Sequence, residues 1–245
     1  EKSLPRPMSR QIEQTQLIVN VIEASSPTQV KFDIFKRINT GGKHLNNQEI
    51  RNCIATPSTR KLLHNMVHTD LFLEATGGSD LAKRMDDQEL ALRFIGFRQV
   101  HQKRLEYNGN MNSFLNKLVD MLNGMKEKDL QVLVHSFEVA LRNCLYLFGD
   151  YAFRKYLPEQ LEPGARRQAI NKSLFTTWTV VLSNRDVRAK AAPGSFAHIQ
   201  ANELANDSGF YLNLTSKTSN RTIIEQVFIK VESIAVAHLP NLQPA

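Results

Sequence analysis

Residues 130–149, LQVLVHSFEVALRNCLYLFG, decide the fold class of this chain. Apolar side chains recur through the stretch at intervals of three and four residues, which is the period of an α-helix with one buried face. Gly149 follows the last apolar residue, and glycine is typical of the position just after a helix. The stretch therefore predicts a core helix that ends at Gly149.

The same period recurs on both sides of this helix. Its apolar positions are Leu62, Leu63 and Met66; Leu90, Phe94, Phe97 and Val100; Phe114, Leu118 and Met121; Leu174, Phe175, Trp178 and Val181; and Val227, Phe228, Val231 and Ile234. Helix start and stop signals such as Thr56-Pro57 and Asn123-Gly124 separate the segments. We therefore expect a helical bundle domain over residues 56–245 and a chain that is mainly α.

Residues 16–22, QLIVNVI, form the one convincing strand pattern, because they are β-branched and are followed by the turn-forming Ser25-Ser26-Pro27. A helix is expected over residues 28–38, and another is expected to begin near Asn46. A lone strand has unpaired edges and is marginal in water. We therefore predict a small α/β unit at the N-terminus, residues 1–55, whose strand pairs with strands that this sequence does not contain.

Two helices are expected to begin with a capping box, in which the side chains of the cap and of the third helical residue bond each other's backbone N–H groups. In the first, Asn46 caps, Glu49 bonds back, and Leu45 packs on Ile50. Residues 85–90, MDDQEL, repeat this pattern.

The composition limits the classes of partner. The chain has 245 residues, and 31 Lys and Arg against 24 Asp and Glu give a net charge of +7, which favours binding to polyanions such as DNA. No apolar run approaches the roughly 20 residues that span a bilayer, so no membrane partner is expected. Cys53 and Cys144 have no partner at metal-ligand spacing, which argues against a zinc site and a disulfide framework and favours a cytoplasmic location.

Residues 31–52, KFDIFKRINTGGKHLNNQEIRN, resemble the second conserved block of the GmrSD-type restriction and antiphage family, whose catalytic-type domain is related to the ParB and sulfiredoxin fold. The matching residues are Phe35, Arg37, Ile38, Asn39, Thr40, Gly41, Gly42, Leu45, Glu49, Ile50 and Arg51. A weaker resemblance continues through residues 84–90, 148–154 and 170–175. It implies that residues 1–55 are the C-terminal part of a ParB-related α/β domain in a prokaryotic defence protein that processes DNA.

One departure from the family bears directly on catalysis. The family's first block contains Asp-Gly-Gln-Gln-Arg, and this chain has no Asp-Gly dipeptide. We therefore expect the catalytic half to lie in a missing upstream segment of the same protein or in a separate chain. The resemblance implies a nucleoside triphosphate with Mg in the complete protein and nucleotide-dependent DNA cleavage, while this chain alone is expected to be inactive. We assign no catalytic residue.

The loop between the two N-terminal helices is the candidate ligand site. Its two glycines allow close backbone approach, and the following helix offers free N–H groups and the positive end of its dipole to a phosphate. The candidate ligand-binding residues are Arg37, Asn39, Thr40, Gly41, Gly42 and Lys43. The alternative interpretation is purely structural, with a helix end, a capped helix and a surface pair between Arg37 and Glu49 or Asp33.

A second basic group, Arg185, Arg188 and Lys190, is expected to follow a nucleic-acid backbone. His64 and His68 share a helical face, but the sequence lacks the glutamate of the metalloprotease motif, so we expect surface histidines and no metal site. The competing functional hypothesis is a non-catalytic helical scaffold that forms a homo-oligomer or docks a partner.

Overall fold

The computed structural model describes residues 4–16, 19, 21, 23, 26–38, 44–78, 81–162, 164, 166–183, 187–215 and 219–239, with the backbone alone at 28, 29, 35, 36 and 38. These residues fold into helices, and the mainly α prediction is confirmed. The helices are α1 (Arg6–Glu13), α2 (Thr28–Ile38), α3 (Asn47–Ile54), α4 (Pro57–Val67), α5 (Asp70–Thr76), α6 (Asp86–His101), α7 (Met111–Asn123), α8 (Glu127–Phe148), α9 (Lys172–Val181), α10 (Ser195–Asn206), α11 (Ser208–Thr215) and α12 (Arg221–His238), with 3-10 turns at Gly149–Tyr151 and Pro158–Gln160.

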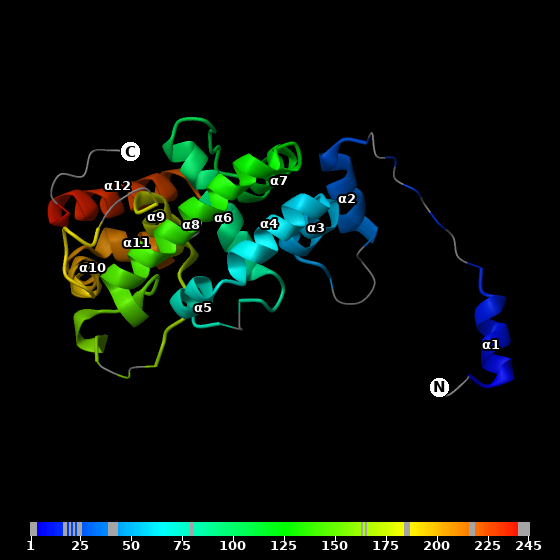
Figure 1. Ribbon diagram of the computed structural model, residues 1–245, viewed down its shortest axis with the longest axis horizontal. Helices are drawn as coiled ribbons and strands as arrows, with labels where there is room; N and C mark the ends of the chain where they lie inside the picture. The colour runs from blue at the N-terminus through cyan, green and yellow to red at the C-terminus, as the bar shows by residue number, and fades with distance from the viewer. Residues whose placement is uncertain are drawn as a thin grey trace.

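Helix α8 is the predicted core helix, and it runs through the helical body beside α4, α5, α9 and α10 (Figure 1). Its apolar stripe is buried from Leu130 to Phe148, and Gly149 follows its last residue. The indole of Trp178 on α9 is fully buried against Phe148 and Phe196. The three-and-four spacing therefore identified the centre of the core correctly.

Helix α6 lies against α3, α4, α7 and α9 and is buried along most of its length. It approaches α7 closely at Gly96, where an added Cβ would lie 2.7 Å from Cε1 of Phe114. No larger residue fits there without movement of the phenyl ring. Helix α12 completes the fold against α9 and α11.

Helices α2 and α3 pack against each other at one end of the body (Figure 1). Both also contact α7, and α3 contacts α6 as well. Ile50 of α3 is only 1% exposed. The segment that carries the family resemblance therefore lies directly on the bundle.

The N-terminal α/β unit is not supported. Of the predicted strand 16–22, residues 17, 18, 20 and 22 lie outside the described residues, while Gln16, Val19 and Val21 are in no strand. Val19 and Val21 are 75% and 84% exposed. The described residues contain no other strand that could share a hydrogen-bond ladder with this segment, so a β-branched run is not enough to make a strand here.

The two predicted capping boxes differ. At α3 the box is present, since the Asn46 side chain accepts from the Glu49 N–H at 2.8 Å and Glu49 Oε2 accepts from the Asn46 N–H at 2.6 Å. At α6 the prediction is wrong, because Asp86, the expected cap, is already the first helical residue. The cap is Met85, which is left-handed, with φ 61°, and makes no side-chain cap bond. The side chain of Glu89 turns instead to the cations described below.

Candidate functional site

The carboxylate of Glu89, in the first turns of α6, is the centre of a charged network. It lies 2.9 Å from Nη2 of Arg93, 3.3 Å from Nη2 of Arg51 and 3.3 Å from Nζ of Lys172. Burial alone raises the pKa of Glu89, but the three nearby positive charges outweigh it, and the net pKa lies below its ordinary value. Glu89 is therefore a carboxylate shared by cations from α3, α6 and α9.

Arg51 of α3 is the most deeply buried member of this network, with no exposed surface. Its Nε donates to Oε1 of Gln48 at 2.8 Å, and its Nη1 lies 3.5 Å from the amide oxygens of Asn112 and Asn116 on α7. Burial lowers the pKa of Arg51 to about 10, an effect that Glu89 partly offsets. Arg51 therefore stays charged at neutral pH and depends on Glu89 as its counter-ion.

A second ion pair attaches the loop before α6 to the start of α3. Nη2 of Arg84 lies 2.8 Å from Oε2 of Glu49 and also donates to the carbonyl oxygen of His44. In return, the Asn46 side-chain amide donates to the Arg84 carbonyl oxygen at 2.8 Å. Arg84 has φ 98° and Met85 has φ 61°, two left-handed non-glycine residues in succession. These contacts hold a backbone turn that side chains normally avoid.

Apart from Arg93, the members of this charged network come from three of the segments that carry the family resemblance. Glu49 and Arg51 belong to residues 31–52, Arg84 and Glu89 to residues 84–90, and Lys172 to residues 170–175. Lys172 also lies 3.0 Å from Asp86. The fold therefore brings together residues that are far apart in the chain and that share no obvious local motif.

The charged network can position helices, and the cavity found beside it is small. Its seven members are Arg51, Arg84, Arg93, Lys172, Glu49, Asp86 and Glu89, and their ion pairs leave little unbalanced charge. The small cavity beside Arg93 holds about 10 Å³, which is room for no more than one water molecule. Its chemical role is to fix α3 on the bundle.

A second buried arginine, Arg154, connects several loops and a helix end away from the charged network. It was not identified from the sequence. It is 1% exposed, and its guanidinium donates only to backbone carbonyl oxygens. These acceptors, at 2.7–3.3 Å, are Ala75, Thr76, Asp150, Ala152 and Gln168. Ala75 and Thr76 end α5, so Arg154 satisfies helix-terminal carbonyls that have no partner within the helix.

The predicted ligand loop is described only at its edge. Arg37 lies exposed in the last turn of α2, while Asn39, Thr40, Gly41, Gly42 and Lys43 lie outside the described residues. At the start of α3 the Glu49 carboxylate already bonds the Asn46 N–H and pairs with Arg84. The N–H groups of Asn46 and Glu49 are therefore already bonded, and the Glu49 carboxylate would repel a phosphate at this helix start.

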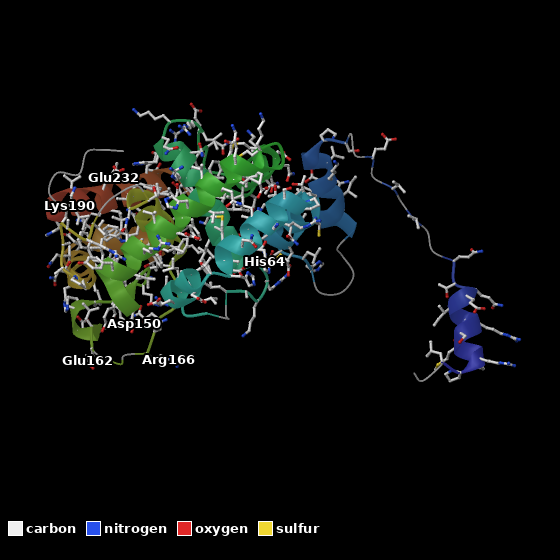
Figure 2. All side chains as sticks on the ribbon, viewed as in Figure 1. His64, Asp150, Glu162, Arg166, Lys190 and Glu232 are labelled. Atoms are coloured by element: carbon white, nitrogen blue, oxygen red, sulfur yellow. The ribbon has the colours of Figure 1, made fainter. Side chains whose placement is uncertain are left out.

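The predicted nucleic-acid group lies at the other end of the molecule. Arg185 is outside the described residues, and Arg188 and Lys190 belong to the turn before α10. The Arg188 guanidinium carbon is 5.8 Å from the centre of the Tyr146 ring. Figure 2 shows Lys190 at the end of the body opposite to α2 and α3. The two predicted phosphate-binding groups are therefore not brought together.

His64 and His68 stack on each other on α4, with ring centres 3.8 Å apart, and Nδ1 of His68 lies 2.8 Å from the His64 carbonyl oxygen. Among the residues with described positions, no three His, Cys, Asp or Glu side chains gather as metal ligands would. Within the same part of the chain, no helix has the length and apolar character needed to cross a membrane.

The chain matches no protein-family model, no curated protein and no solved structure. The charged network was missed by sequence reasoning because its ion pairs join residues up to 86 positions apart, as in Lys172 and Asp86. One sign of this network is present in the sequence, since Glu49, Arg51 and residues 84–90 all belong to segments that resemble the family.

Proposed function

We propose that this chain is the C-terminal portion of a GmrSD-like prokaryotic defence protein and contributes phosphate contacts for nucleotide-dependent DNA cleavage. In this proposal, Arg37 and residues 39–43 bind a phosphate, and the Asp-Gly-Gln-Gln-Arg half acts from a segment that this sequence does not contain. The nucleoside triphosphate and Mg belong to the complete protein.

The observation that carries the proposal is the convergence of the resembling segments on Glu89. Arg51, Arg84 and Lys172 connect residues 31–52 to α6 and α9 through charged contacts. Such a network fixes α3, the helix that follows the candidate ligand residues, and groups that are held in place before binding lower the ordering cost of binding an anion. The net charge of +7 favours the approach of an anionic ligand.

DNA is the ligand that suits both predicted sets of phosphate-binding residues. Arg37 adjoins the loop at the end of α2, whereas Lys190 lies at the opposite end of the body (Figure 2). A duplex presents phosphates along its whole length, so it can contact groups at opposite ends of the body. The loop therefore serves as one end of an extended contact, with Arg188 and Lys190 as the other.

The test is a double substitution, Arg37→Ala with Lys43→Ala, in the full chain. Binding of a short labelled DNA duplex is followed by fluorescence anisotropy over a range of salt concentrations. Removal of two phosphate contacts should make the negative slope of log K against log salt shallower by about 2. The matched control is Lys126→Ala with Lys128→Ala, which removes two exposed charges at the start of α8. Unchanged DNA binding by the loop variant, with the fold retained, argues against the proposal.

Two further arms separate the ligands. Arg188→Ala with Lys190→Ala should weaken duplex binding but leave binding of a fluorescent ATP analogue unchanged. Loss of ATP-analogue binding in the loop variant, with duplex binding retained, would assign the loop to a nucleotide instead of DNA.

The alternative function is a non-catalytic helical scaffold. The observation that favours it is an open apolar groove of about 650 Å³ between α6 and α12, at which no member of the charged network lies. A chain whose loop variant binds DNA and nucleotide as the native chain does would fit this alternative.

A further inference from the structure

Two Asn-Gly dipeptides occur in this chain, Asn108-Gly109 and Asn123-Gly124, and the fold places them in different surroundings. In such a dipeptide the backbone nitrogen of glycine can attack the side-chain amide carbon of asparagine, because glycine has no Cβ to obstruct the approach. The reaction needs a glycine N–H that is free to lose its proton and an asparagine side chain that can turn toward it. The fold therefore decides which of the two dipeptides reacts.

Asn123-Gly124 is held by hydrogen bonds at the end of α7. The Asn123 Oδ1 accepts from the Thr56 N–H at 2.9 Å and from the Thr59 hydroxyl at 2.8 Å, so this side chain is fixed toward the start of α4. The Gly124 N–H donates to the Met121 carbonyl oxygen at 3.2 Å. Both reacting groups are already bonded, and reaction here requires the end of α7 to open.

Asn108-Gly109 lies in the connection between α6 and α7, and Asn108 is exposed. The Gly109 N–H donates to no acceptor among the residues that the structure describes. The Asn108 Oδ1 accepts from the Asn110 N–H at 3.2 Å, which turns the side chain over the Gly109 peptide. This bond closes a small ring that contains the Asn108 amide carbon and the Gly109 nitrogen, so the two reacting atoms are held near each other.

The loop conformation explains why a glycine follows Asn108. Gly109 has φ 93°, in the left-handed region that other residues rarely adopt. Gly124 has φ −95°, which any residue can adopt. The fold therefore requires the reactive dipeptide in the α6–α7 connection but not at the end of α7.

We infer that Asn108 is a site of spontaneous deamidation. The Gly109 nitrogen gives up its proton to water and forms a bond to the Asn108 amide carbon. The bond from that carbon to the side-chain nitrogen breaks, and ammonia leaves. Water then opens the cyclic imide at either of its carbonyl groups, which gives aspartate or isoaspartate. The net change consumes water and releases ammonia, with no oxidation or reduction.

The product carries a new negative charge beside the starts of two helices. Asn110 is the cap of α7, and a Cβ on Gly109 would lie 3.5 Å from Cβ of Arg221, the first residue of α12. The N-terminal end of a helix is positive and favours a nearby carboxylate. Deamidation therefore changes the charge of the junction between α7 and α12 while the chain stays folded.

The test is peptide mapping by mass spectrometry after incubation of the full folded chain at mildly alkaline pH. Asn108 should convert at least about tenfold faster than Asn123, because only reaction at Asn123 needs the helix end to open first. The matched control is the same chain unfolded in guanidinium chloride, where both dipeptides are equally free and should convert at similar rates. Chromatography of the peptides separates aspartate from isoaspartate.

Two variants identify the reacting residue. Asn108→Gln should abolish conversion in the α6–α7 connection and leave conversion at Asn123 unchanged, whereas Asn123→Gln should leave conversion at Asn108 unchanged. Equal rates at the two positions of the folded chain, faster conversion at Asn123, or an Asn108 that reacts only after unfolding overturns the inference. The inference does not rest on phosphate binding or on the scaffold alternative, since none of these measurements involves a ligand or a partner.

Discussion

Arg51 and Glu89 lie 38 residues apart in the chain, yet the Arg51 Nη2 and the Glu89 Oε2 are 3.3 Å apart between α3 and α6. Arg51 is fully buried, so its charge has no access to water. The pair therefore connects the segment of family resemblance to the bundle at a position where loss of either charge is costly.

Substitution of Glu89 by glutamine tests this dependence. Glutamine has nearly the same shape but leaves the buried Arg51 without its counter-ion, so we expect the free energy of unfolding to fall by about 3 kcal/mol. Urea denaturation measures the change. Glu138→Gln breaks a partly exposed pair with Arg142 within α8 and should cost less than about 0.5 kcal/mol. Equal effects of the two substitutions would contradict the role of Glu89.

The Glu89 carboxylate should also make the stability of the fold depend on pH. Because the folded-state pKa of Glu89 lies below its ordinary value, its stabilising effect is complete above the unfolded pKa of about 4.3 and is lost as pH falls through the folded pKa. Melting temperatures between neutral and acidic pH should therefore fall less steeply for Glu89→Gln than for the native chain. Parallel curves would show that Glu89 does not titrate with folding.

Gly96 should not tolerate a side chain. In Gly96→Ala the added Cβ would lie 2.7 Å from the Phe114 ring, and the required movement should lower stability by about 1–3 kcal/mol. Gly124→Ala is the matched control, because the nearest atom to its Cβ is 3.7 Å away and its φ is −95°. Thermal unfolding of both variants gives the comparison, and a Gly96→Ala chain as stable as the control would contradict the close approach of α6 and α7.

Arg154 should be irreplaceable even by lysine. The guanidinium donates to five carbonyl oxygens in different directions, whereas an ammonium group has three donors at a single point. Arg154→Lys should therefore leave buried carbonyls unsatisfied and cost about 3 kcal/mol in the free energy of unfolding. Arg142→Lys on the exposed side of α8 should be nearly neutral. Chemical denaturation that finds both substitutions neutral would exclude this account of Arg154.

The core was predictable because its cause is local. The stripe from Leu130 to Phe148 repeats every three or four residues, so it identifies α8 without any tertiary information. The cap of α3 was predictable for the same reason, since Asn46 and Glu49 are three residues apart and bond each other. Helix α5 was missed although Thr69 caps it and Gly77 ends it, because seven residues are too few for a clear period.

The site was not predictable because its partners are remote in sequence. The sequence of residues 85–90 fits a capping box with Asp86 as the cap, but Asp86 is already the first helical residue, and Glu89 pairs with Arg51, Arg93 and Lys172. Residues 16–22 have the β-branched composition of a strand, but a strand also needs a second strand with which to form hydrogen bonds. Local patterns specify what a segment favours, and the remaining chain decides whether that preference is realised.

The burial of Arg51 also bears on how the molecule unfolds. Its contacts are complete only when α3, α6 and α7 are all in place. Detachment of α3 would therefore expose Arg51 to water and leave Glu89 without one of its cations. Local opening at this end of the molecule should therefore be nearly as costly as loss of the whole fold. Amide hydrogens of α3 should exchange at rates close to those of α6, and residues 47–101 should behave as one cooperative unit across the boundary drawn at residue 55.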